Sequence, residues 1–248
     1  MYADLVARYT NEGFVSPITI CDPPRATVIC QEFDRLEQRV GRSTLEQAHK
    51  EGAEAILKGK LKCDFVLEVA TNKSLLDRIS ALLGEDIMLI NISRFFCRYG
   101  PDLERFTGWH QDVTFLGLDP PKMVTAWYAI DDVDEKNGCL QVVPGSHCGR
   151  IRQHTESERR GNILNHNREI ALTADDLNTA IHLPLRSGEA CLFSGSLIHG
   201  AGKITTPRRR AALACRYIQP STVARNSIVN AGLVVRGQDN YNNYGPIM

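Results

Sequence analysis

The hydrophobic pattern changes from a helical to a strand period near residue 85, and this change limits what the chain can fold into. Before it, apolar side chains recur at helical spacing in four segments, residues 3–12, 24–39, 45–57 and 74–83. After it, β-branched and aromatic residues dominate five segments, residues 87–99, 124–130, 140–143, 190–193 and 211–218. Helices followed by short strands with turns between them predict a mainly β fold. We expect an antiparallel, cupin-like jelly roll with flanking N-terminal α-helices.

The two halves of the chain do not differ in composition, which predicts a single domain over residues 1–248. Within it we expect a helical flank over residues 1–84 and a jelly-roll core over residues 85–220. Polar, irregular sequence at residues 147–180 interrupts the strands. An insertion of that length in a compact domain is usually functional or mobile, so we predict a lid there.

Charge and cysteine content narrow the range of partners. Acidic and basic residues number 29 each, so no net charge favours nucleic acid or an anionic membrane as a partner. The eight cysteines include no C-x-x-C pair, which argues against a structural zinc site. The first residues lack the apolar run of a signal peptide, and no stretch approaches the ~18 apolar residues of a membrane span. We expect a cytoplasmic protein with its cysteines as small core residues.

The segment FTGWHQDVTF, residues 106–115, contains the main candidate metal site. His110 and Asp112 are two residues apart, and on a strand such residues point to the same face. His199, in the apolar-then-glycine setting SGSLIHGAG, is the candidate third ligand and would come from another strand. Two histidines and one carboxylate on one side of an ion suit non-haem Fe(II). Alone, the H-x-D pair is weak evidence, because a surface histidine beside a solvated aspartate has the same spacing.

Arg210, eleven residues after His199, is the candidate anchor for an acidic co-substrate. A buried guanidinium can hold a carboxylate through two parallel hydrogen bonds. Arg208 and Arg209 are expected to lie in a solvated turn, whereas Arg210 borders the strand at 211–218 and can point into the jelly roll. His49 lies in a charged helical segment and is expected to be solvated.

With these motifs the chain resembles the phytanoyl-CoA dioxygenase family of iron(II)/2-oxoglutarate oxygenases. The matching segments are GWHQD (108–112), the stretch 125–147, RSGEACLFSGSLIHGAG (186–202) and RRAALACRYI (209–218). The resemblance covers residues 85–220 well and the first 84 loosely. It implies a double-stranded β-helix that uses Fe(II), 2-oxoglutarate and O2.

The resemblance also assigns residues. It implies that His110, Asp112 and His199 hold the metal and that Arg210 holds the C5 carboxylate of 2-oxoglutarate. Trp127 corresponds to an aromatic residue that lines the same pocket. The family often has Ser or Thr two residues after the distal histidine, where this chain has Ala201. Thr125 or Thr205 could supply the missing hydrogen bond.

Polar residues in the strand before the motif are further candidates for co-substrate binding. Strand alternation allows either Asn91 and Ser93 or Arg94 and Arg98 to face the metal, and the sequence does not decide between these pairs. Ser93 is the candidate that we add to Arg210, Trp127 and Thr125.

The implied reaction is hydroxylation of an unactivated carbon, with succinate and CO2 as co-products. Related halogenases have Ala or Gly in place of the carboxylate ligand, so Asp112 favours hydroxylation over halogenation. Desaturation, cyclisation and epoxidation use the same cofactors and stay open. The alternatives of another class are a jelly-roll module that binds a ligand without chemistry and a metalloenzyme that does not use 2-oxoglutarate.

The expected substrate is a small amino acid or a natural-product intermediate, free or tethered to a carrier. The residues expected to border it are Trp109, Gln111, Phe115, Leu116, Arg152 and His154. We expect a monomer or homodimer.

Overall fold

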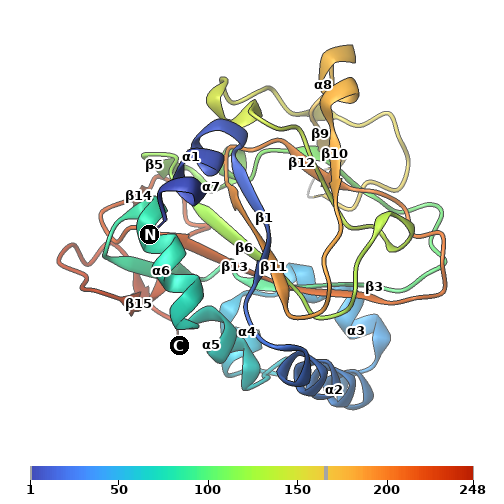
Figure 1. The fold of residues 1–248 in the computed structure, drawn as a ribbon, viewed down its shortest axis with the longest axis horizontal. Coiled ribbons are helices and arrows are strands. Elements are labelled where there is room, and N and C mark those ends of the chain that lie inside the picture. The colour runs from blue at the N-terminus through green and yellow to red at the C-terminus, as the bar shows by residue number, and fades with distance from the viewer. Residues whose placement is uncertain (1, 165–166, 248) are drawn as a thin grey trace.

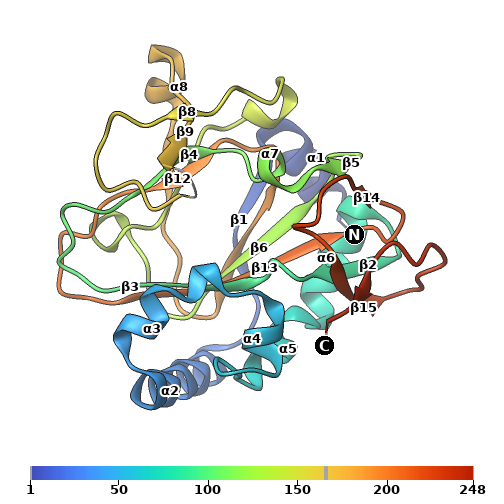
Figure 2. The same ribbon diagram turned by 180° about the vertical axis from the view of Figure 1, so that it is seen from behind.

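The computed structural model describes residues 2–164 and 167–247, and it consists of two main β-sheets and two isolated strand pairs, with helices packed against one of the main sheets (Figures 1 and 2). The N-terminal third is mostly helical, and one strand, β1 (Phe14–Thr19), interrupts it. The helices there are α1 (Ala3–Glu12), α2 (Pro23–Val40), α3 (Arg42–Glu46), the 3-10 turn η1 (Ala48–Lys50), α4 (Ala53–Leu57), α5 (Phe65–Ala70) and α6 (Lys73–Leu83). The four predicted helical segments are present, although the segment at 45–57 is broken into short pieces.

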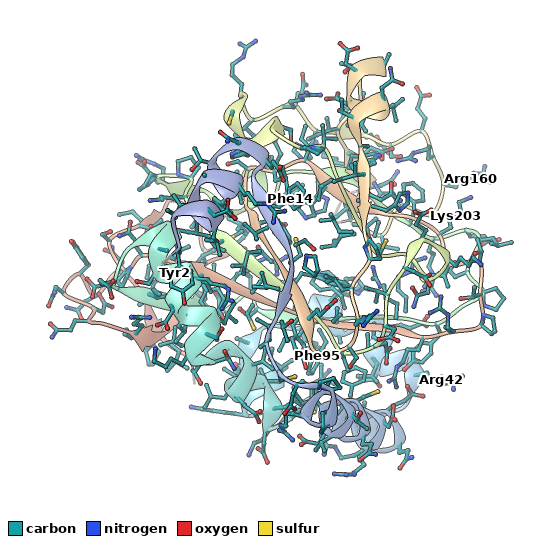
Figure 3. The ribbon with its side chains drawn as sticks, in the orientation of Figure 1. Tyr2, Phe14, Arg42, Phe95, Arg160 and Lys203 are labelled. Atoms are coloured by element: carbon teal, nitrogen blue, oxygen red, sulfur yellow. The ribbon has the colours of Figure 1, made fainter. Side chains whose placement is uncertain are left out.

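Helix α2 illustrates how the sequence builds the flank. Asp22 caps it by accepting a hydrogen bond from the Arg25 backbone N–H at 2.9 Å, and prolines fill the first turn. Its apolar face buries Phe33 and Leu36 against the sheet. The ring of Phe33 meets Phe95 edge-on, with 5.1 Å between centroids, on the side of the sheet that Figure 3 shows facing α2.

The later strands form the two sheets. The large one has eight strands in the order β1-β11-β6-β13-β2-β15-β16, with β3 also paired to β13, and the smaller one has the order β10-β7-β12-β4. The strands of the large sheet after β1 are β2 (Ile87–Ile90), β3 (Arg94–Arg98), β6 (Val124–Ala129), β11 (Glu189–Ser194), β13 (Arg210–Ile218), β15 (Ala231–Arg236) and β16 (Gly245–Pro246). Those of the small sheet are β4 (Thr107–His110), β7 (Leu140–Val142), β10 (Ile181–Leu183) and β12 (His199–Ala201). Short elements connect them: α7 (Val113–Leu116), β5 (Leu118–Asp119), η2 (Glu135–Asn137), η3 (Ser146–Cys148), β8 (Thr155–Glu156), β9 (Arg168–Glu169), α8 (Ala174–Thr179) and β14 (Val223–Ala224).

Alternation along β6 and β13 divides the interior into two layers. Ala126 and Tyr128 of β6 join the cluster beneath the helices, whereas Trp127 and Ala129 face the small sheet. All the pairings of β6, β11 and β13 with one another are antiparallel. This is the double-stranded β-helix with a helical flank that the sequence predicts, and the fold prediction is confirmed.

The structure differs from the sequence prediction in three places. The segment predicted as one strand at 87–99 is two strands, because a turn at residues 91–93 separates β2 from β3. The large sheet takes β1 from the predicted flank and β15 from beyond residue 220. The insertion at 147–180 contains β8, β9 and α8, and its residues 165 and 166 lie outside the described residues.

All eight cysteines fall in the described ranges, and there they form no disulfide. Four of them are buried, Cys97, Cys139, Cys191 and Cys215. None of the described helices combines the length and the apolar composition needed to cross a bilayer.

We expect Leu36→Ala to lower the free energy of unfolding by about 2–5 kcal/mol, because Leu36 is 1% exposed and its truncation leaves a cavity between α2 and the sheet. Leu67→Ala is the matched control: Leu67 lies on α5 and is 44% exposed, so its loss should cost less than about 1 kcal/mol. Urea unfolding followed by circular dichroism measures both. Equal losses in the two variants would show that the helical flank is not packed as described.

Candidate active site

Three buried side chains that could ligate a metal converge between the two sheets. His110 ends β4 and His199 begins β12, and these residues are Cα partners in the antiparallel pair β4–β12. Asp112 lies beyond the strand, at the N-cap of α7, and its carboxylate points back toward the two histidines. One ligand atom from each of the three lies within 4.8 Å of the others. Gly200 permits the close approach of β12 to β4, since a Cβ there would lie 2.9 Å from the Thr107 carbonyl oxygen.

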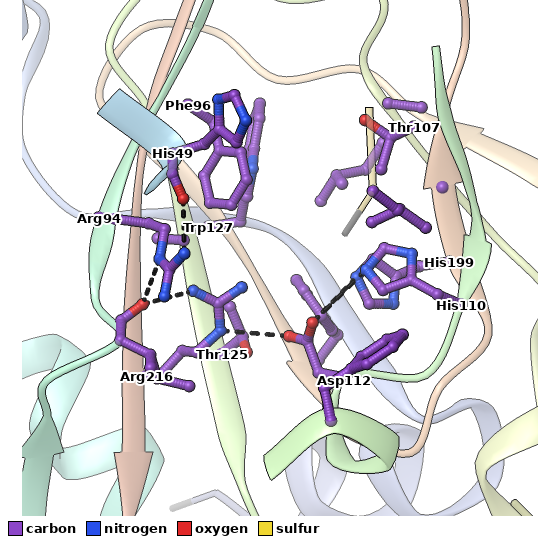
Figure 4. Close-up of a pocket in the computed structure, with 18 of the residues that line it drawn as sticks. His49, Arg94, Phe96, Thr107, His110, Asp112, Thr125, Trp127, His199 and Arg216 are labelled. Atoms are coloured by element: carbon purple, nitrogen blue, oxygen red, sulfur yellow. Dashed lines mark hydrogen bonds and ion pairs between the residues drawn. The ribbon is translucent and has the colours of Figure 1, made fainter. Parts of the chain in front are cut away.

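Backbone carbonyls fix the tautomer of both histidines. His110 Nδ1 lies 2.9 Å from the Gly108 oxygen, and His199 Nδ1 lies 3.0 Å from the Leu197 oxygen. A carbonyl only accepts, so each Nδ1 must donate, and Nε2 is the ring atom of each histidine that is left to ligate a metal. The Nε2 atoms lie 3.5 Å and 4.0 Å from Asp112 Oδ1, as Figure 4 shows for the cluster. Burial and the neighbouring His110 lower the pKa of His199 to about 3, so its imidazole is neutral and able to ligate at neutral pH.

Arg216 orients the carboxylate of Asp112 and keeps it ionised. Arg216 was not among the site residues predicted from the sequence. Its Nε donates to Asp112 Oδ2 at 3.2 Å, and its Nη1 donates to the Ile92 oxygen at 2.8 Å. Burial alone would raise the pKa of Asp112, but Arg216 and the two histidines hold that pKa well below its usual value. One carboxylate oxygen is therefore occupied, and the other faces the two histidines. Two imidazole nitrogens and one anionic oxygen on one side of a site fit Fe(II) or a similar divalent metal.

Arg210 occupies the other end of the same cavity, and it has no carboxylate partner among the residues that the structure describes. It is 2% exposed, its Nη1 donates to the Gly138 oxygen at 3.0 Å, and its Nε has no partner in the described parts of the chain. Burial, with a smaller contribution from Arg98, lowers the pKa of Arg210 to about 9. The Trp127 ring lies below the guanidinium, 5.9 Å from centroid to carbon. An unpaired buried cation is costly, so this end of the cavity fits an anion.

Thr125, like Arg210, is a buried residue with an unpaired polar side-chain atom. It is fully buried, it lines the cavity, and its hydroxyl has no partner among the residues that the structure describes. Ala201 also lines the cavity but offers no hydroxyl. Thr205 is directed elsewhere, since its hydroxyl donates to the Lys136 oxygen at 3.1 Å. Of the two candidates to replace the missing hydroxyl, Thr125 is therefore the one that faces the cavity. Its Cα partner on β13 is Arg216, six residues from Arg210 and roughly 20 Å away along the strand, so one carboxylate cannot contact both Thr125 and Arg210. The unpaired Arg210 by itself fits a carboxylate such as that of 2-oxoglutarate.

Ile92, Arg94 and Phe96 line the cavity, so the even-numbered residues of this segment face the metal cluster. Arg98, on the same face of β3, donates instead to Asp102 and to the Gly202 oxygen. Ser93 lies outside the cavity lining, because its hydroxyl accepts the Arg216 backbone N–H at 3.0 Å. Asn91 holds the segment around residues 228–230.

Two of the predicted substrate contacts line the cavity and four do not. Phe115 and Leu116 of α7 are in its wall. Trp109 is on the other face of β4 and packs with Val143, Ile170 and Ile198. Since β4 alternates, the side chain next to a ligand on the strand must point away from the metal.

Gln111, Arg152 and His154 form a structural network behind the metal cluster. The Gln111 amide donates to the Ser196 oxygen at 2.7 Å and accepts the Arg152 backbone N–H at 2.8 Å. His154 Nε2 accepts the Gln111 backbone N–H at 3.1 Å, and the Arg152 side chain pairs with Asp176. These polar groups are occupied within the protein and are not in the cavity lining.

The cavity, about 170 Å³ in volume, includes residues that the sequence pattern did not reveal. His49 of η1 lines it, with its ring stacked on Phe96, in contrast to the solvated position expected. Ile163 and Leu164 of the insertion complete the wall. Arg216 could have been found from its even spacing to Arg210, which places both on one face of a strand.

Comparison with known proteins agrees with this geometry. The family model described as "Phytanoyl-CoA dioxygenase (PhyH)" matches residues 9–212. The peroxisomal phytanoyl-CoA dioxygenase of Rattus norvegicus is 33% identical over 109 residues, which are 44% of this chain and 32% of the rat protein. The chain thus matches about a third of that relative's length. The L-proline trans-4-hydroxylase of Streptomyces griseoviridis is 26% identical over 243 residues, 86% of this chain and 85% of the other.

A solved structure has the same fold. The structure titled "CytC3 with Fe(II) and alpha-ketoglutarate" superposes with a TM-score of 0.69 at 21% identity, and the match covers 99% of this chain and 93% of that one. With the family model matching more than half of its residues, the chain belongs to the phytanoyl-CoA dioxygenase family.

Proposed function

We propose that the protein is an Fe(II)- and 2-oxoglutarate-dependent dioxygenase that hydroxylates an unactivated carbon of a small molecule, releasing succinate and CO2. The observation that carries the proposal is the buried, unpaired Arg210 in the same cavity as the His110–Asp112–His199 cluster. A ligand-binding module without chemistry would need neither the buried pair of histidines nor the isolated cation.

Each group in the cavity has a role in this proposal. His110, Asp112 and His199 would hold Fe(II), and Arg210 would bind the far carboxylate of 2-oxoglutarate against Trp127, whereas Thr125 lies opposite Arg216. Bound together, Fe(II) and 2-oxoglutarate activate O2 for the oxidation of a C–H bond. Arg216 keeps Asp112 ionised and oriented. Phe115, Leu116, Ile163 and Leu164 exclude water and contact the apolar part of the substrate.

The substrate we propose is a small amino acid or a natural-product intermediate, free or carrier-tethered. The relative from Streptomyces griseoviridis, which aligns over most of both chains, acts on a small amino acid by its name and supports this class. The presence of a carboxylate ligand, Asp112, supports hydroxylation. The proposal also places the enzyme in the cytoplasm as a monomer or homodimer, and its eight free cysteines suit a reducing compartment. A metabolite screen that follows substrate-stimulated succinate release, with mass spectrometry of the product, tests the reaction and separates hydroxylation from desaturation or cyclisation.

Asp112→Ala should weaken binding of Co(II), used as an Fe(II) substitute, by more than about 100-fold, because loss of even an outer hydrogen-bond partner of a metal ligand costs roughly 10–100-fold. It should also abolish hydroxylation. Asp119→Ala, at an exposed aspartate, is the control and should bind Co(II) like the wild type. Calorimetry under anaerobic conditions measures the affinities. Wild-type affinity or full product formation in Asp112→Ala contradicts the assignment of this ligand.

Arg210→Met should raise the dissociation constant of 2-oxoglutarate at least about 30-fold, since losing one partner of a buried charge pair costs roughly 2–5 kcal/mol. The weak visible band of the anaerobic Fe(II) and 2-oxoglutarate complex reports the binding. Without 2-oxoglutarate, the variant should melt no lower than the wild type, because an unpaired buried cation has been removed.

The neighbouring Arg209→Met is the matched control for Arg210→Met. Arg209 forms ion pairs with Asp34, Glu37 and Asp131, so its loss should lower the melting temperature while leaving 2-oxoglutarate affinity within about threefold. A wild-type protein that is folded and shows no band contradicts the co-substrate proposal.

A further inference from the structure

The cavity contains more positive charge than the proposed cofactors account for. Three arginines line it, Arg94, Arg210 and Arg216, and Asp112 is its only acidic lining residue among those described. Arg216 is paired with Asp112, and the proposed 2-oxoglutarate carboxylate pairs with Arg210. Fe(II) and 2-oxoglutarate together add two positive and two negative charges, so the three arginines against Asp112 still leave two positive charges in excess, and neither the metal ligands nor the far carboxylate of 2-oxoglutarate is assigned to Arg94. Arg94 is left without a counterion.

Arg94 is held rigidly without being neutralised. Its Nε donates to the Ile92 oxygen at 3.0 Å, and its Nη1 donates to the His49 oxygen. These bonds leave Nη2 with no protein partner in the described ranges, and Arg94 forms no ion pair there. Burial, and then the adjacent Arg216, lower the pKa of Arg94 to about 10, while Asp112 acts in the opposite direction. Figure 4 shows the guanidinium beside that of Arg216, across the cavity from the two histidines.

The position of Arg94 separates it from the co-substrate anchor. Its Cα partner on β13 is Ala214, four residues from Arg210, so the two arginines are attached roughly 13 Å apart along the strand. The five carbons of 2-oxoglutarate, with four bonds of about 1.5 Å each, span roughly 6 Å at most. The two guanidiniums are moreover fixed to different carbonyls, Arg94 to Ile92 and His49, and Arg210 to Gly138. One co-substrate molecule held by the metal and Arg210 therefore leaves Arg94 available.

The walls near Arg94 are apolar. Ile92, Phe96, Leu116 and Ile228 line the same cavity. Since a second acidic side chain is missing from the described lining, an ammonium group would have no carboxylate partner there. The site therefore favours an anion attached to an apolar body.

We infer that Arg94 is the specificity-determining residue for the substrate and binds its carboxylate, so that the enzyme oxidises a carboxylic acid with an apolar body. This inference rests on the proposed function, because it takes the metal and 2-oxoglutarate positions as occupied by those groups. It adds a second anion position, distinct from that of the co-substrate.

The test uses hexanoate, hexanamide and hexylamine as probes of equal length. Each is titrated into the anaerobic wild-type protein containing Fe(II) and saturating 2-oxoglutarate, which blocks Arg210, and binding is followed by calorimetry and by the shift of the visible band. We expect hexanoate to bind at least tenfold more tightly than hexanamide, and hexylamine to bind more weakly than both. Arg94→Gln should abolish the preference for hexanoate, and Arg94→Lys, which keeps the charge, should retain part of it.

The dissociation constant of 2-oxoglutarate decides between two roles of Arg94. It should change less than about threefold in Arg94→Gln. A tenfold weaker affinity for 2-oxoglutarate with the probe preference retained would assign Arg94 to the co-substrate and overturn the inference, as would a wild type without any preference for hexanoate. If Arg94→Gln does not fold, the wild-type probe series and Arg94→Lys still decide. Absence of the visible band in the wild type contradicts the proposed function, whereas a normal band without carboxylate preference contradicts this inference alone.

Discussion

Strand β13 sorts its side chains between two faces, and both the core and the candidate active site depend on this alternation. Ala211, Leu213, Cys215 and Tyr217 enter the core beneath the helices. Arg210, Ala214 and Arg216 line the cavity on the other face. Because β13 pairs with β6, β3 and β2, a slip of one residue in its register would place two arginines in the apolar core. The hydrophobic effect that aligns the sheet therefore also positions the charges of the cavity.

These charges are placed at a cost to the fold. Arg210 and Arg94 are held by carbonyl oxygens, which orient a guanidinium but do not neutralise it. By contrast, Arg209, next to Arg210 on the chain, points to the other side and is surrounded by Asp34, Glu37 and Asp131. Neighbouring residues of one type thus differ in role because of the face they occupy. The paired arginine ties α2 to the sheet, whereas the unpaired ones leave the cavity ready for anions.

The sequence was sufficient for the fold and the metal cluster, and less so for the remaining cavity. The change of hydrophobic period predicted the helical flank and the jelly roll, and the spacing of His110, Asp112 and His199 predicted three residues that the structure brings together. Alternation left two faces of residues 91–98 open, and no local pattern indicated that Ile92, Arg94 and Phe96 rather than Ser93 would face the cavity. His49 enters the cavity from a short 3-10 turn packed against β3, a tertiary contact that no local pattern encodes. The roles of these residues toward metal, co-substrate and substrate stay predictions.

Gln111, between two candidate ligands, shows why a residue can matter to the site without entering it. Its side chain joins the β11–β12 connection at Ser196 to the start of the insertion at Arg152, and His154 accepts its backbone N–H. All of these partners are buried or partly buried, so breaking one leaves a polar group without compensation. The insertion, which contributes Ile163 and Leu164 to the cavity wall, is therefore attached to the segment that carries His110 and Asp112. Movement of Arg152 and His154, at the base of the insertion, would therefore act on the backbone between His110 and Asp112. This connection links the wall of the cavity to the geometry of the metal cluster.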